Sequence, residues 1–434
     1  MPAQIDKKIR VLLFPAGSEI AFEIYHSLRH NLHVEIFGAS GKSDHASYLY
    51  DSEHYFEGPY QISDEKFNDH FTELLKEQKI DMVMPTHDSV TEFLAKHRDK
   101  YPAKILTSPY ESTRIARQKI LTYELFQAYD FLPKQYLPPY QNLEYPIFLK
   151  PNQGQGGKGT CLVHTYEELQ EQTSKQPDLV AYEYLPGEEL SVDCFTDRHG
   201  QLRFIGPRTR ARIDFGISFR TESRPVTQDI QTIAETINTK VAIRGAWFFQ
   251  VKKDSTGKYK LMEFAVRQAS TMGLYRQIGV NFALLTIFDA LDIDVKILKN
   301  DYPITLDRRM LNRYKADFTY TKVYIDFDDT IIINEKINII ALQFLYQCKY
   351  AHKKICLLTK HEFDLDETLQ KYCLAKNLFD EIVILHPGED KTDHIVADDA
   401  IFIDNYFFDR EKVKQRHNIP VFDVDAIESL LLNT

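Results

Sequence analysis

Short apolar runs alternate with segments of helical periodicity through the first hundred residues of the chain. Residues 10–15, 33–38, 81–85 and 104–107 are β-rich apolar runs, and apolar residues recur at helical spacing between them, first in residues 19–30. This repeated order predicts an α/β fold for residues 1–111, an open parallel sheet with helices on its faces.

The turns of this predicted sheet bear on what it binds. A single glycine, Gly17, follows the first strand, and the absence of a G-x-G-x-x-G pattern argues against NAD or FAD. Thr86, His87 and Asp88 follow the third strand, at the edge where such sheets bind ligands. Turn and helix-cap roles explain these three residues equally well.

In the middle of the chain, an apolar run ends in a lysine and a glycine-rich segment. Lys150 closes the run at 148–150, and residues 154–159 contain four glycines. A lysine leaving a buried strand supplies a fixed cation, and glycines let backbone N–H groups approach phosphate oxygens. The pattern indicates a nucleotide triphosphate site, although a mobile hairpin tip has the same local pattern.

A hairpin is predicted further along. Residues 245–252 and 259–264 are apolar-rich runs joined through Asp-Ser-Thr-Gly. Pairing of the two runs brings Gln250 and Glu263 to the end of one sheet.

Three arginines alternate with small residues just before this hairpin. If the segment is extended, Arg208, Arg210 and Arg212 present their guanidinium groups on one face, where they could bind phosphate or carboxylate. A solvated edge strand is the alternative.

These motifs carry a resemblance to a known family. The stretch 181–193, which contains Glu-Tyr-Leu-Pro-Gly-Glu-Glu, resembles the adenine and ribose hinge of the ATP-grasp family, and the chain is most similar to the carbamoyl phosphate synthetase type. The resemblance implies an α+β ATP-grasp domain that binds ATP and Mg²⁺. It assigns the nucleotide to Lys119, Lys150, Gly156, Gly157, Glu183, Tyr184, Leu185 and Glu189 with Glu188 as a substitute, the metal to Gln250 and Glu263, and catalysis to Arg210 and Arg267.

The resemblance is incomplete at two positions. Lys119 lies near the start of a helix expected over residues 112–129, where a solvated lysine is as common as a phosphate ligand. The second hairpin strand reads Glu-x-Asn-x-Arg in the family, whereas this chain has Ala265 between Glu263 and Arg267. Mg²⁺ requires oxygen ligands, so we expect one metal ion to be held more weakly or through water.

The last third of the chain contains a second group of strand-end motifs. The run 323–325 ends in Asp-x-Asp-x-Thr, and Thr359, Lys391 and Asp404 follow strands or loops in order. The set resembles the haloacid dehalogenase-like (HAD) phosphatases and implies a Rossmann-like HAD domain.

The resemblance also assigns roles to these residues. Asp326 is the nucleophile, Asp328 the general acid and base, and Thr359 and Lys391 bind phosphate. Asp404 joins Asp326 and the backbone carbonyl of Asp328 around Mg²⁺. Asn405 stands where the family often has a second acid. A helix is expected to begin near Glu335, which leaves no room for a cap domain, so we expect an open site.

Composition limits the partners and location of the protein. The 434 residues suffice for about two to four domains. A net charge of −10 argues against nucleic acid and anionic membranes. The chain has no apolar run of about 20 residues and no signal peptide, which predicts a cytoplasmic protein. Five cysteines without CxxC spacing favour reduced core thiols.

Together these patterns predict a pre-ATP-grasp domain at 1–111, an ATP-grasp domain at 112–300, a linker at 301–317 and a capless HAD domain at 318–434. The predicted function is bifunctional: an ADP-forming carboxylate–amine ligase acting through an acyl phosphate, joined to a Mg²⁺-dependent phosphatase. Its substrates would be small molecules, phosphorylated or sugar-linked ones among them, and the oligomeric state stays open. The alternative is a nucleotide-sensing or substrate-delivering ATP-grasp module with only the phosphatase active.

Overall fold

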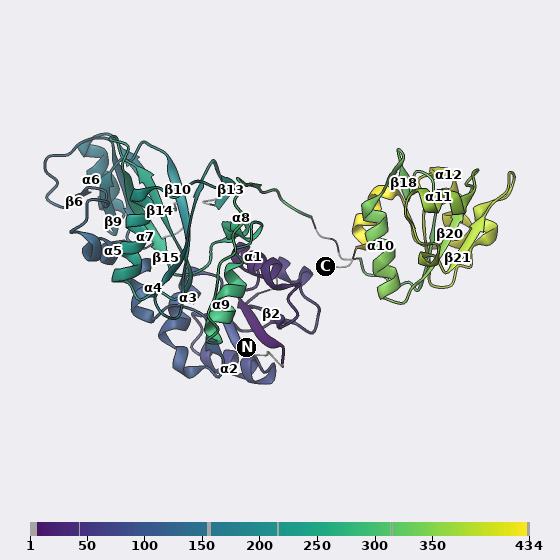
Figure 1. Ribbon diagram of the computed structural model, residues 1–434, viewed down its shortest axis with the longest axis horizontal. Coiled ribbons are helices and arrows are strands. Elements are labelled where there is room, and N and C mark those ends of the chain that lie inside the picture. Colours follow the sequence, from purple (N-terminus) through teal and green to yellow (C-terminus); the bar gives the residue numbers. More distant parts are fainter. Residues whose placement is uncertain are drawn as a thin grey trace. The chain divides into compact units, whose positions relative to one another are not determined.

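The computed structural model describes residues 7–42, 44–153, 158–214, 217–312, 314 and 316–431. The chain divides into two compact units, Met1–Met310 and Leu311–Thr434, drawn in purple to green and in green to yellow (Figure 1). Each described hydrophobic core lies wholly within one unit. No helix in the described ranges has both the length and the apolar character of a membrane span.

The first unit begins with the predicted parallel sheet, which is confirmed. Its strands run in the order β3-β2-β1-β4-β5, all parallel. The elements are β1 (Ile9–Phe14), α1 (Glu19–Leu28), β2 (Val34–Ser40), β3 (Tyr55–Glu57), α2 (Phe67–Glu77), β4 (Met82–Pro85), α3 (Asp88–Lys96) and β5 (Lys104–Ile105).

Both faces of this sheet are covered, because successive side chains of a strand point to opposite faces. Leu12 and Phe14 of β1 enter one core with α2 and α3. Val11 and Leu13 enter another core with α1 and with α9 (Phe282–Ala290). Helix α9 thus packs against α1, some 250 residues earlier in the chain, as Figure 1 shows. Helix α9 belongs to the segment expected as the ATP-grasp domain, yet it shares a core with the parallel sheet of residues 1–111. One core therefore extends across the expected boundary at residue 111.

A second, antiparallel sheet follows, with strand order β6-β9-β7-β8. Its elements are α4 (Tyr110–Arg117), α5 (Lys119–Phe126), β6 (Gln135–Tyr136), β7 (Ile147–Pro151), β8 (Cys161–Val163), α6 (Tyr166–Lys175) and β9 (Leu179–Glu183).

The helix expected over 112–129 is two helices, so that prediction was wrong. Gln118 has extended backbone angles and separates α4 from α5. Asn152, just after β7, then takes the place of helical acceptors: its backbone oxygen accepts from Lys119 N–H at 3.1 Å and its Oδ1 accepts from Ile120 N–H at 2.9 Å. These bonds place Lys119 beside the strand that carries Lys150.

A four-stranded antiparallel sheet, β11-β10-β14-β15, contains the predicted hairpin. The remaining elements of the unit are β10 (Glu189–Thr196), β11 (Leu202–Thr209), β12 (Arg212–Asp214), β13 (Ile217–Glu222), α7 (Gln228–Lys240), β14 (Gly245–Lys253), β15 (Tyr259–Ala265), α8 (Gly273–Arg276) and β16 (Thr305–Asp307). Strands β12, β13 and β16 form a separate small sheet.

The second unit is a parallel sheet in the order β21-β20-β17-β22-β23 with flanking helices. Its elements are β17 (Lys322–Ile325), β18 (Ile332–Ile333), β19 (Lys336–Ile337), α10 (Ile339–Tyr350), β20 (Lys354–Thr359), α11 (Leu365–Lys371), β21 (Glu381–Ile384), β22 (Ala400–Ile403), α12 (Phe407–His417) and β23 (Val421–Phe422).

The helix expected near Glu335 begins later. Asn334 and Glu335 have positive φ and form the two-residue turn between β18 and β19. Helix α10 starts at Ile339, after Asn338, whose side chain accepts from Ile340 and Ala341 N–H.

Candidate functional site

A cavity of about 370 Å³ lies in the first unit, where the parallel sheet meets the antiparallel sheets. Strands β1 and β4 are neighbours at the point where the strand order reverses, and parallel sheets bind ligands outside the carboxyl ends of such strands. Ser18 and Glu19, after β1, and Thr86, His87 and Asp88, after β4, line this part of the cavity.

Two lysines line another part. Lys150 is 8% exposed, and its Nζ donates to the Met262 oxygen at 3.1 Å and lies 4.4 Å from the centre of the Tyr182 ring. Burial, and then the nearby Lys119, lower the pKa of Lys150 to about 8. Burial also lowers the pKa of Lys119, and the Glu263 carboxylate partly opposes this. The cavity therefore holds two cations that burial destabilises and that an anion would stabilise.

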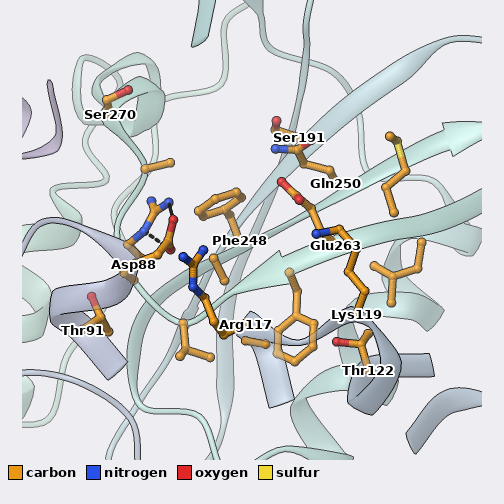
Figure 2. A pocket seen from close by; sticks show the side chains of 18 of the residues that line it. Asp88, Thr91, Arg117, Lys119, Thr122, Ser191, Phe248, Gln250, Glu263 and Ser270 are labelled. Atoms are coloured by element: carbon orange, nitrogen blue, oxygen red, sulfur yellow. Dashed lines mark hydrogen bonds and ion pairs between the residues drawn. The ribbon is translucent and has the colours of Figure 1, made fainter. Parts of the chain in front are cut away.

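One row of polar residues crosses the four-stranded sheet. Strand register pairs Arg208 with Ser191, Ser191 with Gln250 and Gln250 with Glu263, so the four side chains share one face. All four line the cavity, and Figure 2 shows Ser191, Gln250 and Glu263 on the same side as Lys119. Ser191 Oγ and Arg208 Nη1 are buried and have no hydrogen-bond partner among the described residues. Such atoms are costly unless a ligand or water satisfies them.

The three arginines do not share a face, so this expectation was wrong. Strand β11 ends at Thr209, and the chain then joins a different sheet. There the Arg212 side chain forms an ion pair with Asp307. Arg208 is 1% exposed and bound by two hydrogen bonds to Asp193. Arg210 lines the cavity and lies 2.6 Å from Glu189.

Arg267 lies deep in the cavity wall rather than free at its surface. Its Nε and Nη2 donate to the two Asp88 oxygens at 2.6 and 2.7 Å, and Nη1 donates to the Gln268 oxygen. Burial disfavours its charge, but the Asp88 carboxylate overcomes this and raises the pKa of Arg267. Within the described ranges these bonds use three of the five guanidinium N–H groups, which leaves two for a substrate oxygen.

The hinge residues lie outside the cavity lining. Glu183, Tyr184, Leu185, Glu188 and Glu189 are absent from it, although Tyr182 belongs to it. Their carboxylates bind protein groups instead: Glu183 accepts from Lys134 N–H, and Glu188 from the Tyr259 hydroxyl. Gly156 and Gly157 fall outside the described residues.

The candidate metal ligands of the first unit are few. Gln250 and Glu263 face the cavity, and the neighbouring Ala265 offers no oxygen. Within the described ranges, no group of three or more His, Cys, Asp or Glu side chains is arranged to hold a metal. Mg²⁺ often needs only one or two carboxylates besides phosphate and water, so the pair fits a phosphate-bound ion.

In the second unit, four of the predicted residues gather at the carboxyl edge of the sheet. Lys391 Nζ lies 2.6 Å from both Asp326 and Asp404, and the three side chains are buried. Burial, partly opposed by Lys391, raises the pKa of Asp326 to about 6. Thr359, at the end of the neighbouring β20, is fully buried, and its Oγ1 has no described partner. Two carboxylates around one cation fit a site that could also hold Mg²⁺.

Asp328 is separate from this cluster and half exposed, with 54% of its side chain accessible. Its carboxylate lies 2.9 Å from His361 Nδ1, and His361 Nε2 contacts Thr368 Oγ1 at 3.0 Å. Asn405 stands where a second acid was expected. Asp409 lies 3.9 Å from Lys391 and forms an ion pair with Lys360 at 2.9 Å.

Sequence reasoning missed Ser191 and His361. Ser191 alternates with Glu189 and Asp193, so the strand period alone would have placed it on their face. His361 follows Thr359 by two residues in a loop, and only the folded loop brings it to Asp328.

Comparison with known proteins supports the fold of the first unit. Residues 175–308 match the model of a family described as ATP-grasp in the biosynthetic pathway with Ter operon. A search of curated proteins found no match. The first unit contains an ATP-grasp-type domain.

Solved structures show the same fold at low identity. The fold occurs in the biotin carboxylase domain of Hydrogenobacter thermophilus 2-oxoglutarate carboxylase, in complex with MgADP, ADP and bicarbonate. The identity is 15% and the TM-score 0.55, and the match covers 68% of this chain and 70% of that one. It also occurs in Staphylococcus aureus N5-carboxyaminoimidazole synthetase complexed with ADP. Here the identity is 16% and the TM-score 0.56, and the match covers 69% of this chain and 81% of that one. An L-amino acid ligase from Bacillus licheniformis is 18% identical with a TM-score of 0.51. This match covers 68% of this chain and 75% of that one.

Proposed function

We propose that the first unit is an ATP-dependent, ADP-forming ligase that joins a small-molecule carboxylate to an amine. The observation that carries this proposal is the cavity in which Lys119 and Lys150 lie beside Gln250 and Glu263. Similar structures hold ADP, with Mg²⁺ in one case, and one of them is an amino acid ligase. A cavity lined by one buried lysine, one half-buried lysine and two oxygen ligands suits a Mg²⁺-bound triphosphate.

The chemistry follows from these positions. Lys119 and Lys150 hold the β- and γ-phosphates while the substrate carboxylate attacks the γ-phosphorus, which gives an acyl phosphate and ADP. Glu263 and Gln250 would hold Mg²⁺, which would supply positive charge to neutralise the transferred group. An amine then attacks the acyl carbon, loses a proton and expels phosphate. The free N–H groups of Arg267, together with Arg210, stabilise the oxyanion.

Replacement of Lys150 or Glu263 tests this assignment. Lys150→Ala and Glu263→Gln should each lower ADP formation by about 100-fold or more, because each removes charge that positions the phosphates. ADP is measured by a coupled assay during a screen of amino acids and sugar acids, with mass spectrometry of the product. Lys175→Ala, at an exposed lysine of α6, is the matched control and should be as active as wild type. Near-normal ADP formation by a folded Lys150→Ala protein would contradict the ligase assignment.

For the second unit we propose a Mg²⁺-dependent phosphatase of the HAD type. Asp326 attacks the phosphorus of a phosphate ester while Asp328 protonates the leaving oxygen. Asp328 then takes a proton from water, and the resulting attack on the aspartyl phosphate releases phosphate and restores Asp326. Thr359 and Lys391 hold the phosphate oxygens. Asp326 and Asp404 would hold Mg²⁺, which would supply positive charge to neutralise those oxygens.

Ala265 favours a second candidate, in which the first unit senses nucleotide or delivers a substrate. The missing oxygen ligand beside Glu263 weakens metal-assisted transfer more than nucleotide binding. ADP binding without Mg²⁺-dependent turnover on any acid and amine would support this candidate over the ligase.

A further inference from the structure

Four exposed aromatic side chains flank the carboxylate cluster of the second unit. Their exposed fractions are 77%, 53%, 57% and 55% for Phe363, Tyr406, Phe407 and Phe408. Large aromatic side chains contribute much of the energy of cores and interfaces when buried, so a group of them in solvent commonly marks a binding surface.

These residues, here called the aromatic rim, lie in two segments on either side of one strand: the loop that holds Phe363, and the start of helix α12 with the Tyr406 that precedes it. Phe363 follows β20, and Tyr406 to Phe408 follow β22. Both strands pair in parallel with β17, which ends at Ile325, just before Asp326. The carboxyl ends of parallel strands meet at one edge, so the two segments of the rim flank the reacting carboxylates.

Each segment of the rim contacts a residue of the carboxylate site or a neighbour of one. The Phe363 ring lies 5.8 Å from the His361 ring, and His361 binds Asp328. On the other side, Tyr406 N–H donates to Asp404 Oδ1 at 2.7 Å. Phe408 packs against both Tyr406 and Phe407, with ring centroids 5.5 and 5.6 Å apart. The rim therefore begins within a few residues of the groups that would hold and cleave the phosphate.

The other edges of the rim limit what it can bind. The segment between Asp328 and α10 contains only the short β18–β19 hairpin, so no cap domain is inserted there. Without a cap domain at this point, the leaving group of an ester can extend past Asp328 to the aromatic rim rather than into a chamber that such a cap would enclose. Rings bind flat ligands by stacking, and stacking tolerates many ring chemistries.

We propose, on the basis of the phosphatase function above, that the aromatic rim binds the leaving group of the substrate and that this group carries an aromatic or heteroaromatic ring. The substrate class is a phosphate monoester whose ring lies a few bonds from the ester oxygen. Cleavage breaks the phosphorus–oxygen bond, Asp328 returns a proton to the ring-bearing alcohol, and water supplies the fourth oxygen of the released phosphate.

Two matched esters test the proposal on the full chain. Benzyl phosphate and cyclohexylmethyl phosphate both release a primary alcohol and differ in the aromaticity of the ring. We expect kcat/KM to be about tenfold higher for benzyl phosphate, the range that a single stacking contact supplies. Phe363→Ala and Phe408→Ala should each raise KM for benzyl phosphate about threefold to tenfold and change kcat/KM for the cyclohexyl ester by less than about twofold.

The control is Tyr350→Ala, which removes an aromatic side chain that is 91% exposed at the far end of α10. It should leave both esters unchanged. The proposal is overturned, while phosphatase activity stands, if wild type has equal kcat/KM for the two esters. It is also overturned if Phe363→Ala and Phe408→Ala lower kcat/KM for the cyclohexyl ester as much as for benzyl phosphate. If wild type hydrolyses neither ester and no other monoester, both the phosphatase function and this proposal fail. Self-association of wild type in sedimentation velocity that Phe363→Ala or Phe408→Ala abolishes would instead make the rim a protein interface and overturn the ligand assignment.

Discussion

Lys150 shows how a single residue connects burial to ligand chemistry. Its ammonium group is buried near a second lysine, and these surroundings lower its pKa to about 8. Phosphate oxygens would favour the charged form and raise that pKa on binding. The free protein above pH 8 therefore holds Lys150 largely neutral, and nucleotide binding has to return the proton.

This linkage predicts proton uptake. At pH 8.5 binding of ADP or a non-hydrolysable ATP analogue should take up about three-quarters of a proton, and affinity should fall as pH rises above 8. Calorimetry in two buffers of different ionisation enthalpy measures the uptake. Lys150→Arg keeps the charge without titrating in this range, so uptake should largely disappear. Identical binding enthalpies for wild type in both buffers would contradict the predicted shift.

At the scale of elements, the β14–β15 hairpin positions the two proposed metal ligands. Gln250 and Glu263 are opposite each other, and Ala265 pairs with Phe248 one step along the face. The pairing fixes where an additional ligand would project, because residues 263 and 265 point to the same side of β15.

Ala265→Asn should therefore lower the Mg²⁺ concentration that gives half-maximal ADP formation by about threefold or more, since it restores an oxygen beside Glu263. Ala265→Val is the matched control, because it adds volume without an oxygen. A Mg²⁺ titration of the asparagine variant that matches wild type would show that another group already supplies the ligand.

At the scale of the whole molecule, the two units have separate cores and separate candidate chemistry. The residues that line the cavity of the first unit belong to that unit, and the residues around Asp326 belong to the second. We therefore expect the two activities to be separable by point substitutions within one chain.

Asp326→Asn should abolish Mg²⁺-dependent hydrolysis of phosphate esters, because it removes the nucleophile, and should leave ADP formation within about twofold of wild type. Lys150→Ala should do the reverse. Asp366→Asn, at an exposed aspartate paired with Lys376, is the control for the second unit. Undiminished ester hydrolysis by Asp326→Asn would exclude the phosphatase assignment.

The sequence by itself determined features that depend on local pattern. Alternating strands and helices specified the parallel sheet, and the turn chemistry specified the hairpin that pairs Gln250 with Glu263. Strand-end positions also brought Asp326 and Asp404 to one edge, because parallel strands end together. In each case short-range periodicity decides the geometry.

Only the tertiary structure decided contacts between distant segments. Asn152 interrupts a helical pattern by supplying acceptors from another strand, and Arg267 is held by Asp88, 179 residues away. The arginine alternation failed because the chain changes sheets after Thr209. Helical and strand periods describe one element at a time, whereas these contacts depend on which elements pack together, and packing is a property of the whole core.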